Sequence, residues 1–232
     1  MIRLAVLDMA GTTVDEGGAV YRALDAAVAA TTGRPVPEAT LARWMGADKR
    51  EAVAGLLAAL GAPHGAADVE DVFAEFSARL DEAYLAVPPS PIAGIEDAFA
   101  ALRARDVRIV LTTGFSTRVA TALVAGIGWR VGATIDGVVT AEQVGAGRPS
   151  PKMIERAMAL TDVADPRQVL AAGDTLLDLQ AGANAGAGAV VGVLTGAQDR
   201  ATLEAGPATH VIASAALLPE LIDTLGAPTQ PA

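Results

Sequence analysis

The fold is decided by the stretch LAVLDMAGTT, residues 4–13, in which an apolar run ends at a single acid. The run is short and continuous, which predicts a buried strand. Asp8 closes the strand, and small and hydroxyl residues follow it rather than a second acid. An acid in this place often only caps a helix, so a catalytic role for Asp8 depends on what the rest of the chain brings to it.

Apolar runs of the same kind recur in the second half of the chain, at residues 107–111, 168–172 and 189–194, with a weaker one at 209–212. Helical patterns lie around them, at residues 94–105, 117–125, 151–160 and 176–185. This alternation predicts an α/β fold, a doubly wound parallel sheet with helices on both faces. Such sheets bind ligands beyond the carboxyl ends of their strands, so we expect Asp8, Thr112 and Asp174 to converge.

The segment from residue 18 to residue 88 has a different character. Its alanine-rich helical patterns, at residues 20–31, 49–60 and 69–86, follow one another with no strand between them. Proline-containing breaks close the segment. We therefore expect two domains: a core made of residues 1–17 and 89–232, and an inserted all-helical cap domain made of residues 18–88.

The composition of the 232 residues narrows the class of protein. Hydrophobic residues make up 52% and charged residues 19%, which indicates a globular chain. The net charge of −10 argues against nucleic acid and against an anionic membrane as partner, since both attract basic surfaces. With no cysteine, disulfides and thiolate chemistry are excluded. No signal-peptide pattern or long apolar run is found, so we expect a cytoplasmic protein.

A second group of acids lies in the stretch GDTLLD, residues 173–178, which opens a predicted helix. Asp174 and Asp178 are four residues apart and are expected to share one helix face. Carboxylates gathered at one strand end repel unless a hard cation such as Mg²⁺ neutralises them. A divalent ion beside a carboxylate nucleophile is typical of phosphoryl transfer.

Several groups near the strand ends are suited to bind phosphate. Thr112, Thr113 and the backbone amides beside Gly11 and Gly114 are candidate hydrogen-bond donors to the transferring group. Arg148 is either a cation for phosphate charge or a surface residue.

Taken in order, these stretches resemble the four motifs of the haloacid dehalogenase superfamily, and within it the phosphonatase branch. The first motif corresponds to residues 8–15, the second to Thr112, the third to Arg148 and the fourth to residues 173–178. The resemblance implies a Rossmann-like core and Asp8 as a nucleophile that forms an aspartyl-phosphate. It also implies Mg²⁺ held by Asp8, the Ala10 carbonyl and Asp174, with Asp178 as an outer ligand.

The stretch MGADK, residues 45–49, matches a further phosphonatase segment. The resemblance implies that Lys49 forms a Schiff base with the substrate carbonyl, which takes up the electrons of the broken carbon–phosphorus bond. Asp48 and Glu51 form a capping pattern that puts Lys49 in the first turn of a helix. There the helix dipole and Arg50 lower the pKa of the amine, whereas Asp48 and Glu51 oppose them. The alternative is an exposed helix lysine.

Position 10 separates the members of the superfamily. Most of its phosphatases carry an aspartate there that protonates the leaving alkoxide, and Ala10 cannot move a proton. Cleavage of a carbon–phosphorus bond has no such need. The chain departs from the phosphonatase pattern at Ala52, where the family has histidine, and at Phe115, where it has tyrosine. A relative of phosphonoacetaldehyde therefore fits as substrate better than phosphonoacetaldehyde itself.

The sequence thus predicts a Mg²⁺-dependent hydrolase that cleaves a small 2-oxoalkylphosphonate. The alternatives are a phosphatase or phosphomutase of the same superfamily, acting on a small phosphate, and an inactive binding protein. A homodimer through the helical domain is expected from the resemblance. The predicted catalytic residues are Asp8, Lys49, Thr112 and Arg148. The predicted substrate contacts are Gly11, Thr12, Met45, Gly46, Thr113, Gly114 and Phe115.

Overall fold

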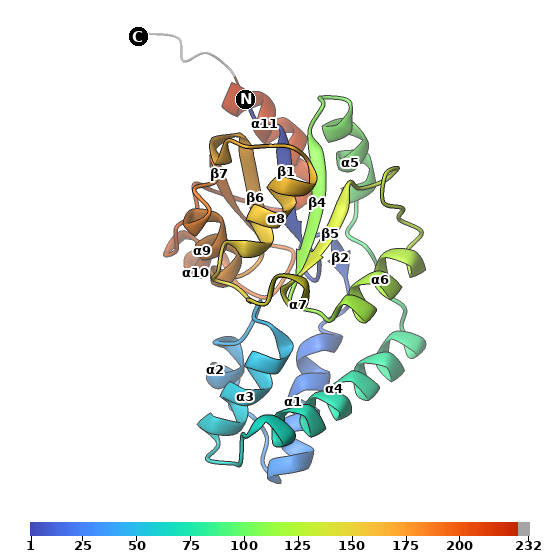
Figure 1. The fold of residues 1–232 in the computed structure, drawn as a ribbon, viewed down its shortest axis with the longest axis vertical. Helices are drawn as coiled ribbons and strands as arrows, with labels where there is room; N and C mark the ends of the chain where they lie inside the picture. Colours follow the sequence, from blue (N-terminus) through green and yellow to red (C-terminus); the bar gives the residue numbers. More distant parts are fainter. Residues whose placement is uncertain (227–232) are drawn as a thin grey trace.

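The computed structural model describes residues 1–226 and contains one six-stranded parallel sheet (Figure 1). The strand order is β5-β4-β1-β6-β7-β8, with every neighbouring pair parallel. The strands are β1 (Leu4–Asp8), β4 (Arg108–Thr113), β5 (Gly137–Thr140), β6 (Val169–Gly173), β7 (Ala189–Val193) and β8 (His210–Ile212). The predicted parallel α/β sheet is confirmed. The short β5 has no counterpart among the predicted strands.

Strands β6 and β7 are apolar throughout, and β1 is apolar up to Asp8, because both faces of the sheet are covered. Alternate residues of β1 belong to two different clusters: Ala5 and Leu7 face one, and Leu4 and Val6 face the other. The covering helices are α5 (Ile95–Arg103), α6 (Thr117–Gly126), α7 (Ala141–Val144), α8 (Lys152–Leu160), α9 (Leu176–Asn184), α10 (Arg200–Glu204) and α11 (Leu218–Gly226). A doubly covered parallel sheet gives this continuous hydrophobic pattern.

Four helices form a separate group beyond one end of the sheet (Figure 1). They are α1 (Ala19–Thr32), α2 (Glu38–Ala42), α3 (Lys49–Ala59) and α4 (Ala66–Ala86), and we call them the helical segment. A short antiparallel pair, β2 (Val14–Asp15) with β3 (Ser90–Pro91), joins the segment to the sheet. The division into two domains at residues 18 and 88 stays a prediction. Within residues 1–226, none of the helices is both long and apolar enough to cross a membrane.

Candidate functional site

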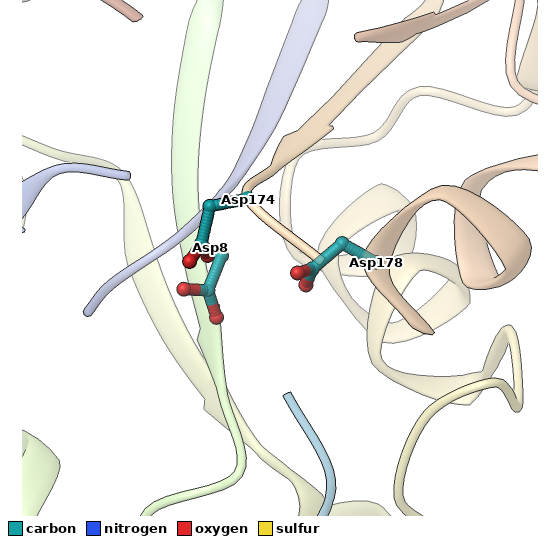
Figure 2. A group of neighbouring side chains, drawn as sticks. All are labelled: Asp8, Asp174 and Asp178. Carbon is teal, nitrogen blue, oxygen red and sulfur yellow. The ribbon is translucent and has the colours of Figure 1, made fainter. Parts of the chain in front are cut away.

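Three buried carboxylates meet at the carboxyl end of the sheet (Figure 2). Asp8 ends β1, Asp174 directly follows β6, and Asp178 lies in the first turn of α9. One carboxylate oxygen from each lies within 4.8 Å of the other two. The predicted convergence is therefore observed, but the predicted helix face is wrong. Helix α9 begins at Leu176, so Asp174 belongs to the strand end and only Asp178 to the helix.

Hydrogen bonds fix the two acids that follow β6. Asp174 Oδ2 accepts from the Ala197 amide at 2.6 Å, and Oδ1 accepts from the Thr12 hydroxyl at 3.3 Å. Asp178 Oδ2 accepts from both the amide and the hydroxyl of Thr175. The Thr175 hydroxyl oxygen in turn accepts from the Asp178 amide, which completes a capping box at the start of α9.

Glycines around the acids let backbone approach them closely. A Cβ on Gly11, whose φ is +82°, would lie 2.7 Å from Asp174 Oδ2. A Cβ on Gly173 would overlap the Asp178 side chain, and one on Gly196 would overlap the Asp174 side chain. These positions therefore exclude any side chain, and the chain packs directly against the carboxylates.

Burial and mutual repulsion disfavour the charged forms of these acids. Burial is the main cause that raises the pKa of Asp8 well above its ordinary value; Arg148 opposes the shift, and Asp178 and Asp174 add to it. Burial, followed by the charge of Asp178, raises the pKa of Asp174 to about 7. A cluster of this kind is stabilised by positive charge.

Arg148 supplies one positive charge to the cluster. Its Nη2 lies 2.8 Å from Asp8 Oδ1, and its Nε lies 2.7 Å from Asp178 Oδ1. Nη2 also donates to the Thr112 hydroxyl oxygen at 2.9 Å, and Nη1 donates to the Gly46 carbonyl at 3.2 Å. The side chain is only 4% exposed, which rules out the alternative of a surface residue.

The acids keep ligand capacity beyond their contacts with Arg148. Asp178 Oδ1 meets Arg148 as an ion pair only, and within residues 1–226 no donor makes an oriented hydrogen bond to this buried oxygen. Together with Asp8 and Asp174 it forms an all-oxygen donor set, which suits a hard divalent cation. The cluster therefore has the chemistry of a metal site.

Lys49 is the first residue of α3 and is 5% exposed. The Asp48 side chain accepts from the amides of Arg50 and Glu51, which confirms the predicted N-cap. Lys49 Nζ donates to the Ala47 carbonyl at 2.8 Å. Its burial excludes the alternative of an exposed helix lysine.

The pKa of Lys49 is lowered, as the sequence predicts, but from a different cause. Burial has the largest effect; Asp8 opposes it and Arg148 supports it. The sequence instead suggests the helix dipole and Arg50. Arg50 points elsewhere, since its Nε donates to Glu70 at 2.6 Å.

The two departures from the phosphonatase pattern are both buried. Ala52 is 0% and Phe115 2% exposed, and neither side chain carries a group that can transfer a proton. Lys49 Nζ lies 5.7 Å from the centre of the Phe115 ring, within the range of a cation–π contact. The Thr113 hydroxyl oxygen accepts from the Phe115 amide at 3.1 Å, which fixes the turn after β4.

In the turn after β1, backbone amides donate to carbonyls of the same turn. The Gly11 amide donates to the Val14 carbonyl at 2.8 Å, and the amides of Thr12 and Thr13 donate to the Met9 carbonyl. The amides of Gly11 and Thr12 are therefore engaged and do not support the predicted role as phosphate donors.

The loop before α3 lies directly on the end of the sheet. A Cβ on Gly46, whose φ is +82°, would overlap the Thr175 side chain, and one on Gly114 would overlap the Ala47 carbonyl. This close approach brings Met45 and Gly46, both predicted substrate contacts, to the carboxylate cluster. Only glycine allows it at both positions.

Tyr21 also lies at this site, and the sequence did not predict it. Its hydroxyl oxygen accepts from the Gly46 amide at 3.2 Å. Tyr21 lines one pocket with Ala10, Met45 and Asp174. A single aromatic residue in an alanine-rich helical pattern carries no local signal of such a position.

Curated relatives of the chain include phosphonoacetaldehyde hydrolases. The one from Parabacteroides distasonis is 32% identical over 137 residues, which cover 59% of this chain and 51% of the relative. The one from Paraburkholderia xenovorans is 28% identical over 195 residues, covering 80% and 72%. The chain thus spans only about half the length of the first of these relatives.

Solved structures share the fold at low identity. A phosphonoacetaldehyde hydrolase like protein from Oleispira antarctica superposes with a TM-score of 0.80 at 23% identity, covering 97% of this chain and 92% of that one. A β-phosphoglucomutase from Clostridium difficile reaches 0.82 at 17% identity, covering 97% and 96%. These likenesses show the fold alone.

The family itself follows from the sequence match. The model of the haloacid dehalogenase-like hydrolase family matches residues 2–186, which is well over half of the chain and includes all three acids, Lys49 and Arg148. This chain belongs to the haloacid dehalogenase-like hydrolase family.

Proposed function

We propose that the protein is a Mg²⁺-dependent hydrolase that cleaves the carbon–phosphorus bond of a small 2-oxoalkylphosphonate. The observation that carries this proposal is the environment of Lys49. Its amine is buried, its pKa is lowered, and the charge of Asp8 acts on it. A neutral amine beside a carboxylate nucleophile is the pair of groups that this reaction needs. The names of the curated relatives point the same way.

Lys49 acts first in the proposed reaction. Its neutral amine adds to the substrate carbonyl, and loss of one water gives an imine. Protonation of the imine nitrogen makes it an acceptor for the electron pair that carbon–phosphorus cleavage releases. A buried lysine with a lowered pKa forms such an imine more readily than an exposed lysine.

Asp8 then attacks phosphorus. The bond from Asp8 to phosphorus forms, the carbon–phosphorus bond breaks, and its electrons pass into the imine to give an enamine. One water hydrolyses the aspartyl-phosphate, and a second hydrolyses the reprotonated imine and frees Lys49. Since imine formation released one water, the sum is one oxoalkylphosphonate and one water giving a carbonyl compound and phosphate.

Arg148 and Thr112 bind the phosphoryl oxygens in this proposal. The guanidinium already meets Asp8 and the Thr112 hydroxyl, so it lies where the transferring group must pass. Asp8, the Ala10 carbonyl and Asp174 would hold Mg²⁺, with Asp178 supporting them. The bound ion would neutralise charge on the carboxylates and on the phosphoryl group.

The side chains at positions 10, 52 and 115 limit the substrate. Ala10 offers no acid for an alkoxide leaving group, and carbon–phosphorus cleavage produces none. Ala52 and Phe115 are buried and apolar, so proton transfer at the carbonyl differs from that of a typical phosphonatase. We therefore propose a relative of phosphonoacetaldehyde as substrate.

An ester phosphatase or phosphomutase is the second candidate function. The likeness to a β-phosphoglucomutase structure and the charge that Lys49 would offer a phosphate or carboxylate are compatible with it. In that case Lys49 binds an anionic group of the substrate through its charge and forms no covalent bond. An inactive binding protein is the third candidate, and Mg²⁺-dependent release of phosphate from any substrate would exclude it.

Borohydride trapping tests the proposal, because borohydride reduces an imine to a stable secondary amine. The chain has only two lysines, Lys49 and the exposed Lys152. Incubation with a 2-oxoalkylphosphonate and then borohydride should add mass to the peptide that contains Lys49.

The label should disappear in Lys49→Arg and persist in Lys152→Arg, the matched control. Carbon–phosphorus cleavage at wild-type rate in folded Lys49→Arg would refute the proposal. Hydrolysis of phosphate esters without any label at Lys49 would favour the phosphatase.

A further inference from the structure

A pocket of about 300 Å³ adjoins the carboxylate cluster on the side of Ala10. Tyr21 of α1 and Met45 of the loop before α3 line it, together with Asp174 and Thr195 beyond the ends of β6 and β7. Residues 15–18, between β1 and α1, also line the pocket. The pocket therefore lies where the chain of a substrate bound at Asp8 can extend.

The pocket wall offers one free side-chain donor. Among the residues that line it, only Tyr21 and Thr195 carry a side-chain hydrogen that can be donated. Thr195 donates its hydrogen to the Gly11 carbonyl at 2.6 Å. The Tyr21 oxygen accepts from the Gly46 amide, and in residues 1–226 its own hydrogen has no acceptor. The phenol hydrogen is left for a bound molecule.

The charge of the pocket selects the kind of group that Tyr21 can meet. Asp15, Glu16 and Asp174 line it, and no lysine, arginine or histidine does. Burial and then the charge of Asp174 raise the pKa of Tyr21 well above its ordinary value, so the phenol stays protonated. The charges of Asp15 and Glu16 repel a second carboxylate or phosphate, so the pocket suits an uncharged oxygen.

The Gly46 residue ties this pocket to the phosphoryl site. Its amide donates to Tyr21, and its carbonyl accepts from Arg148 Nη1 at 3.2 Å. Arg148 in turn meets Asp8. Gly46 thus contacts both the phenol oxygen and the guanidinium, so one loop residue positions both groups.

We propose that Tyr21 contacts the substrate by donating a hydrogen bond to an uncharged oxygen on its carbon chain. This inference rests on the proposed function and narrows the substrate to a phosphonate whose chain carries an uncharged hydroxyl or ether oxygen in addition to the carbonyl. Tyr21 takes no part in bond breaking. Its role is to favour substrates whose carbon chain carries this oxygen.

Two inert phosphonates test this contact without any turnover. 3-Hydroxypropylphosphonate carries the additional oxygen and propylphosphonate lacks it, and neither has a carbonyl that could react with Lys49. Titration calorimetry with Mg²⁺ present should show the hydroxyl compound binding about 3- to 10-fold tighter, the ratio that one neutral hydrogen bond gives. The ratio should fall to about 1 in Tyr21→Phe. 2-Carboxyethylphosphonate should bind more weakly than propylphosphonate.

Tyr84 provides the matched control. It is the only other tyrosine, and its buried hydroxyl has no partner within residues 1–226. Tyr84→Phe should keep the ratio. The proposal is overturned if the wild-type protein does not favour the hydroxyl compound, if neither compound binds, or if Tyr21→Phe keeps the preference. Failure of imine trapping at Lys49 would refute the proposed function and leave this binding ratio unchanged.

Discussion

The metal site can be tested by protein stability rather than by turnover. Two unit charges at most 4.8 Å apart repel by at least about 3 kcal/mol at an effective dielectric constant of 20. Asp8, Asp174 and Asp178 form three such pairs, and Arg148 provides one compensating charge within bonding distance. A divalent cation that binds only the folded chain removes this repulsion, so Mg²⁺ should stabilise the protein against unfolding.

The size of the stabilisation can be estimated. At a Mg²⁺ concentration about 100 times the dissociation constant, binding adds about 2.7 kcal/mol, which for a chain of this length raises the midpoint of thermal unfolding by about 5–11 °C. Circular dichroism of the protein in EDTA and in excess Mg²⁺ measures this shift. The same titration is repeated with each acid replaced.

The contacts of the acids predict the ranking of the variants. Asp178 Oδ2 accepts two hydrogen bonds from Thr175, and Oδ1 forms an ion pair with Arg148 at 2.7 Å. Asp174 Oδ1 accepts only one hydrogen bond, at 3.3 Å. Asp174 is therefore the freer ligand. Asp174→Asn should abolish the shift, because the amide oxygen carries no charge, and Asp178→Asn should only reduce it.

An exposed acid serves as the control in this experiment. Asp223 pairs with Arg105 on the surface, and Asp223→Asn should leave the Mg²⁺ shift unchanged. Two results would refute the reasoning: a full shift in Asp174→Asn, or equal losses in Asp174→Asn and Asp178→Asn. Absence of any shift in the wild-type protein would remove Mg²⁺ from the proposed reaction.

Three further predictions concern the reaction. Asp8→Asn keeps the shape of the nucleophile but not its charge, so turnover should fall below a few per cent of wild type; a folded variant with higher activity contradicts the assignment. Ala10→Asp should speed hydrolysis of an alkyl phosphate, towards the ~10²–10⁴-fold that general acid catalysis supplies, and no gain in a folded, Mg²⁺-binding variant would exclude this explanation. Imine trapping at Lys49 needs the neutral amine, so its rate should rise with pH and reach its midpoint below pH 10.5. Burial lowers the pKa of Lys49 and Arg148 adds to this effect, whereas the charges of Asp8, Asp48 and Asp178 oppose it. A midpoint at or above pH 10.5 would contradict this prediction.

The sheet could be predicted from the sequence because its strands are buried on both faces. Residues 169–173 and 189–193 are apolar throughout, the pattern of parallel strands that helices cover on both faces. The positions of Asp8 and Asp174 followed, because each is the first polar residue after an apolar run. Strand β5 was missed since it has only four residues and begins with glycine, which gives no periodic signal.

The spacing of the two acids along the sequence led to a wrong prediction of how they are placed. Asp174 and Asp178 are four residues apart, which suggests one helix face, yet Thr175 caps α9 and leaves Asp174 outside it. The two acids still converge, because the strand end and the first helical turn point at the same place. Spacing thus indicated the right partners for the wrong geometric reason.

The burial of Lys49 and the contacts of Tyr21 could not be predicted from the sequence. The capping pattern of Asp48 places Lys49 at the start of a helix, where a lysine is ordinarily exposed. Its burial comes from the loop before α3 lying against the sheet end, a contact between segments about 65 residues apart that depends on glycine at position 114. The same contact sets Gly46 between Tyr21 and Arg148. The amine, the phenol and the guanidinium therefore acquire their chemistry from one closure of the helical segment on the sheet. A substitution that holds the segment away, such as Gly114→Ala, should weaken all three at once.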